Sequence, residues 1–155
     1  MKTLGEEEEE RRTTPLGFFN LAKSYYNASV ALRSAKVKST HADSPVYFLY
    51  CHALELYLKA FLRAHGYSAN ELRGNQLGHR IARLNKKAKA AGLVLTEHDI
   101  AVLAMIGGLD AFTRFRYIRP GPVTLPEFDE LDRTCKRLHA SVGAGLEQAG
   151  IMVRV

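Results

Sequence analysis

Apolar residues recur at helical spacing along most of the chain, and each run ends at a residue that stops or caps a helix. Thr14-Pro15 places a capping residue directly before a proline, as at the start of a helix. The apolar positions from Phe18 to Leu32 then follow every three or four residues. The pattern predicts a helix from Pro15 to about Ser39.

The same signals predict the remaining helices. Gly66 and Gly92 follow two of the periodic runs, and glycine commonly ends a helix. The helix expected over 96–111 is apolar nearly all round, which is typical of a central helix. Gly107-Gly108 inside it would either let a second helix approach closely or mark a bend in the helix. The expected segments are 44–64, opened by Ser44-Pro45; 76–91; 96–111, opened by Thr96 and Asp99; and 124–148, opened by Thr124 and Glu127.

The predicted fold class is all-α, because β-branched residues alternate only in 151–155, a stretch too short to build a sheet. We expect an up-and-down bundle of four main helices plus one short helix. A chain of 155 residues with 46% hydrophobic and 25% charged residues fits one globular domain. That domain is expected over 15–155, after a charged N-terminal tail over 1–14 in which a run of glutamates repels itself.

The sequence pattern is not that of a membrane protein, and its charge favours anionic partners. No apolar run approaches the roughly 18–20 residues of a membrane helix, and Glu6 to Glu10 stand where a signal peptide would need basic and then apolar residues. A cytoplasmic protein without membrane contact is therefore expected. Residues 15–155 hold 19 basic and 11 acidic side chains. Such a body attracts phosphate polymers or acidic partners, although many mildly basic proteins bind neither.

Neither a metal nor another cofactor is expected. Cys51 and Cys135 lie far apart and belong to no C-x-x-C pair. The histidines show no spacing typical of zinc ligands.

A polar strip interrupts the apolar helix over 44–64. His52, Glu55 and Lys59 are three and four residues apart, so their side chains share one face. Glu55 precedes Lys59 by four residues, the favoured order for a helical ion pair. Two readings remain open, a solvated face or a polar wall along a groove.

The chain resembles a HEPN domain (higher eukaryotes and prokaryotes nucleotide-binding) over about residues 15–148. The resemblance is carried by residues 53–62, which contain a Glu-x-x-Leu-Lys-Ala helix segment, by Gly66, and by Gly78-His79 opening the next helix. It continues at residues 114–117, which are similar to an Arg-Tyr segment that many members carry after the third core helix.

This resemblance implies a bundle of four or five helices, usually a homodimer with a cleft near its two-fold axis. Many members are metal-independent ribonucleases, often toxins paired with a minimal nucleotidyltransferase antitoxin, and others bind nucleotides or RNA without catalysis. Catalytic members carry an arginine followed, after four to six residues, by a histidine. No histidine follows Arg114 or Arg116 at that spacing, which favours binding over catalysis.

The leading hypothesis is an RNA- or nucleotide-binding HEPN-like domain with a basic cleft at a dimer interface. One alternative is a non-catalytic module that docks a nucleotidyltransferase-type partner, and another is an active metal-independent ribonuclease. For catalysis, a histidine could carry the proton and an arginine could stabilise charge on phosphorus. The catalytic candidates are His79 and Arg116, and the ligand-binding candidates are His52, Glu55, Lys59, Arg114, Tyr117 and Arg119.

Simpler roles for these candidates remain open. Phe115 and Tyr117 would suit base stacking beside arginines, or they could anchor a loop in the core. His79 could line a cleft opposite the His52–Glu55–Lys59 strip, or it could bond nearby backbone. The basic helix over 76–91 could follow a phosphate backbone or present an ordinary solvated face.

Overall fold

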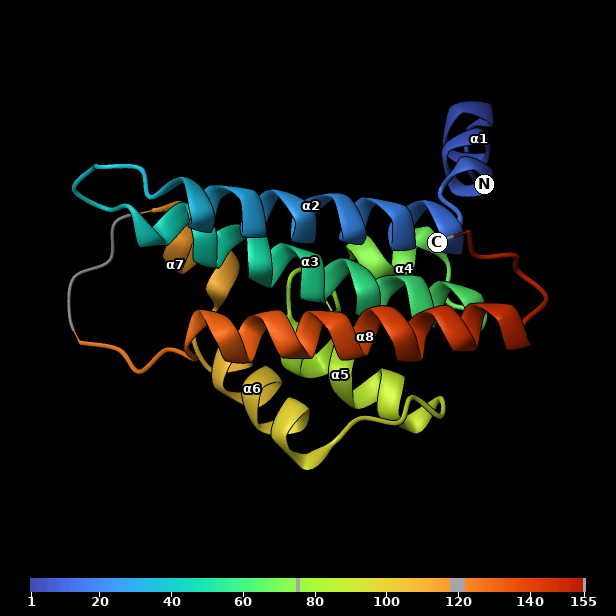
Figure 1. Ribbon diagram of the computed structural model, residues 1–155. Helices are drawn as coiled ribbons and strands as arrows, with labels where there is room; N and C mark the ends of the chain where they lie inside the picture. The colour runs from blue at the N-terminus through green and yellow to red at the C-terminus, as the bar shows by residue number, and fades with distance from the viewer. Residues whose placement is uncertain (75, 118–121, 155) are drawn as a thin grey trace.

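The computed structural model describes residues 1–74, 76–117 and 122–154, and over these ranges it contains helices and no strand (Figure 1). The all-α fold class predicted from the sequence is confirmed. Three short helices, the first, fourth and seventh, add to the expected set. In chain order the helices are α1 (Leu4–Arg12), α2 (Pro15–Ala35), α3 (Asp43–Ala64), α4 (Ala69–Arg73), α5 (Ile81–Ala90), α6 (Glu97–Gly107), α7 (Ala111–Arg116) and α8 (Phe128–Gln148).

Helix α3 is the centre of the bundle. It contacts α2, α8, α7, α5 and α4, and α2 and α8 run along it (Figure 1). Every residue from Ala53 to Leu62 is buried, as expected of a helix covered on all sides. The expectation that the 96–111 helix is central is wrong: α6 packs against α5 and α8, and its Met105 is exposed.

The capping residues define most helix ends as the sequence indicates. Thr14 caps α2, with its hydroxyl accepting from the Gly17 amide. Gly66 and Gly92, at φ +97° and +104°, follow the ends of α3 and α5. Both adopt the left-handed conformation that glycine accommodates without a steric cost.

Three predicted starts are displaced. The helix expected from residue 76 is α5, which begins at Ile81 after the turn that carries His79. Helix α3 begins at Asp43 after Ala42, without a side-chain cap, so Ser44 lies inside the helix. Helix α8 begins at Phe128, and the capping box is formed by Glu127 and Glu130 instead of Thr124 and Glu127. A glutamate at the N-cap is less common than threonine, so the sequence pattern favoured the wrong pair.

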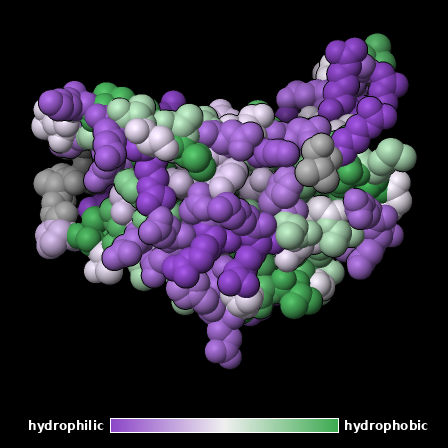
Figure 2. All heavy atoms as spheres, viewed as in Figure 1, coloured by the Kyte–Doolittle hydropathy of each residue, from purple (hydrophilic) through white to green (hydrophobic). Residues whose placement is uncertain are grey.

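The charged N-terminal segment, predicted as a tail, forms helix α1. It buries no side chain, and its hydrophilic surface projects from the bundle (Figures 1 and 2). Glu10 anchors it: its carboxylate accepts from the backbone amides of Ala69 and Asn70 at 2.6 and 3.2 Å. A carboxylate is favourable there because the first amides of α4 lack helical partners. Arg63 completes the anchor by donating to the Thr13 carbonyl at 2.9 Å.

None of the helices described combines the length and apolar character needed to cross a bilayer.

Gly107 allows α6 and α5 to pack closely, as the glycine pair suggested. A Cβ built at Gly107 would lie 2.9 Å from the Cβ of Ala82 and 3.2 Å from its backbone nitrogen. No flexible side chain can move aside there, because the opposing atoms are the Cβ and the backbone of Ala82 in α5. The close contact therefore fixes where α5 lies relative to α6.

The exchange Gly107→Ala is expected to lower the free energy of unfolding by about 1–3 kcal/mol, because the added methyl group overpacks this contact. Gly108→Ala is the matched control, since its Cβ would meet only ordinary contacts at 3.6 Å or more. Urea unfolding followed by circular dichroism measures both variants. Equal stability of the two variants would contradict the close packing.

Candidate functional site

The centre of the candidate site is a buried ion pair on α3. The Lys59 ammonium donates to Oε1 of Glu55 at 2.8 Å, and the two residues are only 5% and 2% exposed. Lysine and glutamate are rarely this buried unless they are paired. The predicted four-residue pairing is present, and the interpretation as a solvated face is wrong for these residues because both are buried. They are covered because α5 and α7 pack on α3 as well as α2 and α8.

His79 connects this pair to the surface. It follows α4 in the turn before α5, and its Nδ1 lies 2.8 Å from Oε1 of Glu55. Its side chain is 45% exposed, whereas that of Glu55 is only 3% exposed. Of the two interpretations left open for His79, the one that places it opposite the α3 strip is met at Glu55.

His52 lies one turn before Glu55 and contacts the second carboxylate oxygen. Its Nδ1 is 3.5 Å from Oε2 of Glu55, a separation that fits an ion pair when the ring is protonated. The imidazole lies edge-on to Tyr25 of α2, with ring centroids 4.4 Å apart, and parallel to Phe48 at 5.9 Å. His52 therefore belongs to the inner part of the group formed by His52, Glu55, Lys59 and His79.

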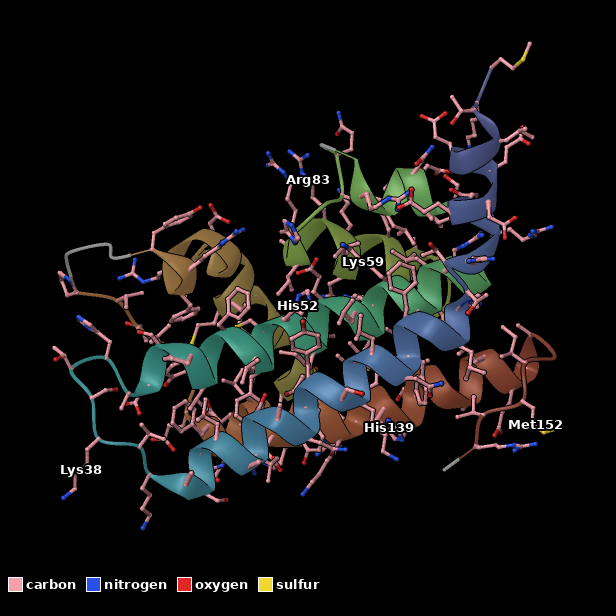
Figure 3. The ribbon with its side chains drawn as sticks, turned by 90° about the horizontal axis from the view of Figure 1, so that it is seen from above. Lys38, His52, Lys59, Arg83, His139 and Met152 are labelled. Carbon is pink, nitrogen blue, oxygen red and sulfur yellow. The ribbon has the colours of Figure 1, made fainter. Side chains whose placement is uncertain are left out.

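The orientation of these groups is visible from above the bundle. Figure 3 shows His52 and Lys59 on the upper side of α3, between α7 and the segment of α4 and α5. Arg83 projects from α5 on the same side of the molecule (Figure 3). His139 of α8 lies on the other side of α3, where its Nδ1 is 2.9 Å from the Tyr57 hydroxyl.

The surroundings of Glu55 keep it ionised. Burial is the largest single effect and raises its pKa, but the contacts with His52, Lys59 and His79 together outweigh it and hold the pKa at about 2. A carboxylate only accepts hydrogen bonds, so the nitrogen of His79 that faces it must carry the proton. Glu55 therefore sets both the orientation and the tautomer of the exposed imidazole.

This arrangement has two chemical uses. A carboxylate behind an imidazole orients the ring for proton transfer at Nε2, as in acid–base dyads. Alternatively, a protonated imidazole can bind an anion, because Lys59 already balances the charge of Glu55. Glu55 and Lys59 do not reach the surface themselves. They act on the site only by orienting His79 and by balancing the charge beneath it.

The α7 candidates form a second cluster. Arg114, Arg116 and Tyr117 line a hollow of about 340 Å³ that also includes His41 and Pro45. Pro45 precedes Glu55 by ten residues on the same helix, which corresponds to about 15 Å along its axis. Sequence reasoning paired His79 with Arg116, whereas here each meets a different part of α3.

Residues 114–117 contain two aromatic residues, of which one is an anchor and one is exposed. Phe115 stacks on Tyr47 with ring centroids 5.2 Å apart, which ties α7 to α3. Tyr117 is 60% exposed, and the Arg116 guanidinium lies 5.7 Å from its ring centroid. Arg119 lies outside the described residues.

Sequence reasoning missed the contribution of Tyr67. It lines a hollow between α4 and α5 together with Arg83 and Lys87. The only available signal was an aromatic residue directly after Gly66, and such a residue is equally typical of a core contact. In the part of the chain that the structure covers, no group of three or more histidine, cysteine, aspartate or glutamate side chains is arranged to hold a metal ion.

Comparisons of the chain with protein-family models, with curated proteins and with solved structures find no match. The function is therefore inferred from the geometry of the site.

The pKa of Glu55 predicts a specific dependence of stability on pH. A folded-state pKa near 2 against an ordinary value of 4.5 stabilises the fold above pH 4.5, and this contribution disappears as the pH falls toward 2. It amounts to at most about 3 kcal/mol, at 1.36 kcal/mol per pKa unit. Removing both charges with Glu55→Gln and Lys59→Met together should flatten the urea-unfolding profile between pH 5 and pH 2 relative to the unmodified protein.

Removing one charge should be costlier than removing both. Glu55→Gln alone leaves a buried ammonium without its counterion and is expected to cost about 3–5 kcal/mol of unfolding free energy at pH 7. The double variant should recover much of that loss. If the single and double variants were equally unstable, the ion pair would not be the reason for the cost.

Proposed function

We propose that this protein is a HEPN-like helical domain that binds the phosphate groups of RNA or of a nucleotide. The observation that carries the proposal is the 2.8 Å contact between His79 and the buried Glu55 carboxylate. It holds an exposed imidazole in one orientation, with the charge of the carboxylate already balanced by Lys59. Such an imidazole is suited to contact a phosphate.

Positive charge around His79 supports an anionic ligand. Helix α5 begins two residues later and contains no acidic side chain, while Arg83, Lys86 and Lys87 are exposed along it. Helix α7 adds Arg114 and Arg116 in its last turn. Arginine and lysine clusters of this kind supply the sequence-independent part of nucleic-acid binding.

A metal-independent ribonuclease is the second candidate function, and the Glu55–His79 contact favours it too. His79 Nε2 would accept the proton of an RNA 2′-hydroxyl as that oxygen bonds to phosphorus. The 5′-oxygen would then leave and take up a proton, giving a cyclic phosphate and a 5′-hydroxyl. Arg116 would serve this reaction only if the RNA extends from His79 to α7.

The resemblance to HEPN domains also brings protein partners into the proposal. It implies a homodimer and, as the alternative function, a non-catalytic module that docks a nucleotidyltransferase-type protein. In that alternative the basic surface would meet acidic groups of a protein instead of phosphates.

The His79→Ala exchange tests both binding and cleavage. Purified protein is incubated with a mixed single-stranded RNA pool in EDTA, and one gel reports the shift and the products. His79→Ala is expected to weaken the shift about tenfold, because a charge-assisted contact of roughly 1.5 kcal/mol or more is lost. Any cleavage should disappear with the same exchange.

His98→Ala is the matched control, since His98 is an exposed histidine in the first turn of α6. It should bind like the unmodified protein. A shift without cleavage supports the binding function, and cleavage lost only in His79→Ala supports the ribonuclease. Absence of both signals, or equal loss in the two variants, would refute the role assigned to His79.

A further inference from the structure

A hollow of about 710 Å³ lies between α4 and α5, next to the turn that carries His79. Its volume is in the range of sites that hold a nucleotide-sized ligand. Arg83, Lys86 and Lys87 form one wall, and Tyr67 and Leu77 contribute an aromatic and an aliphatic surface. The combination of cations with an aromatic ring suits a phosphate and a base together.

Within the described part of the chain, the cations of this wall keep their charge. Among the described residues, no carboxylate lies within ion-pair distance of Arg83, Lys86 or Lys87. Arg83 is positioned by donating to the Gln76 carbonyl at 3.1 Å, so its guanidinium is held without loss of charge. The wall therefore retains its attraction for an anion.

One acidic side chain faces the same hollow. Glu71 lines it, but its carboxylate accepts from the Ser68 amide at 3.2 Å in the capping box of α4. Three cations against one capped carboxylate leave the hollow positive. Glu71 is also placed where a carboxylate oxygen could accept from the amino group of a base.

The cations follow α5 in a row that leads away from His79. Arg83 and Lys87 are one turn apart, about 6 Å along the helix axis, and Arg83 follows His79 by four residues. An extended single strand presents successive phosphates to such a row. A duplex would instead place its bases out of reach of Tyr67.

We propose that the hollow between α4 and α5 seats one nucleotide of a single-stranded RNA whose neighbouring phosphate reaches His79. The base stacks on Tyr67, and Arg83 and Lys87 hold the phosphates. This inference rests on the proposed function and specifies its ligand as a strand instead of a free nucleotide.

Two pairs of variants test the hollow by fluorescence anisotropy with a labelled eight-nucleotide RNA across a salt series. Lys87→Gln should weaken binding about fivefold and lower the magnitude of the salt slope by about 0.7, the value for one phosphate contact on a single strand. Lys89→Gln makes the same charge change on the same exposed helix but does not line the hollow. It should change affinity by less than about twofold.

Tyr67→Leu should weaken binding at least about fivefold through loss of stacking, and Tyr67→Phe should keep affinity within about twofold. An RNA duplex of the same length and a glutamate-rich peptide are the competitor controls. Both should displace the labelled strand at least about tenfold less effectively than unlabelled strand does.

The outcomes separate this inference from the proposed function. One result would refute the hollow as the binding site but leave the proposed function standing. In that result, His79→Ala weakens RNA binding, whereas Lys87→Gln behaves like Lys89→Gln and Tyr67→Leu leaves the affinity unchanged. If the unmodified protein binds no RNA, the inference about the hollow and the RNA-binding form of the proposed function are both refuted. Equal displacement by the acidic peptide would overturn the inference in favour of a protein ligand.

Discussion

The buried pair of Glu55 and Lys59 fixes the geometry of the candidate site. Removing two charges from water costs several kcal/mol per ion, and their attraction repays this only when their remaining bonding capacity is also satisfied. A carboxylate can accept about four hydrogen bonds, and one ammonium at 2.8 Å cannot saturate it. His79 from the turn before α5 and His52 from α3 supply further contacts, so the ion pair helps to fix that turn against the central helix.

The same constraint explains why an exposed side chain can be so well defined. A histidine in a surface turn ordinarily samples several rotamers. Here a buried carboxylate with a pKa near 2 fixes the ring from behind at any physiological pH. Hydrophobic residues at positions 55 and 59 could give an equally stable core, because buried ion pairs are often replaceable at no cost. They would leave His79 without its acceptor, so the pair does more for the geometry of the site than for its stability.

The sequence predicted the parts of this site that depend on local spacing. The four-residue offset of Glu55 and Lys59 and the stop at Gly66 follow from helical periodicity and turn residues. The position of His79 opposite α3 was one of two interpretations that the sequence left open. The sequence did not predict burial, because whether a polar strip is covered depends on helices far away in the chain. The strip was compatible with both a solvated face and a groove until α5 and α7 were seen to pack on α3.

Helix α1 was missed for the same reason. Its glutamate run has no buried face, and its position depends on Glu10 meeting amides that lie 59 and 60 residues further along the chain. The start of α8 was misplaced for a local reason, since Glu127 competes with Thr124 for the cap and its partner Glu130 decides the outcome.

The placement of α1 has an electrostatic consequence for α5. Its glutamates form ion pairs with basic residues of their own helix and with Arg63 and Arg73, at the end of α3 and on α4. Acidic charge is thus concentrated beside α4, while α5 carries cations and no carboxylate. The electrostatic field of an exposed charge decays over about 10 Å at moderate salt. Opposite charges farther apart than this do not neutralise each other. The ion-paired glutamates of α1 and the cations of α5 thus lie on different helices. Under the proposed function, the basic wall beside Tyr67 is the surface that would meet a polyanion.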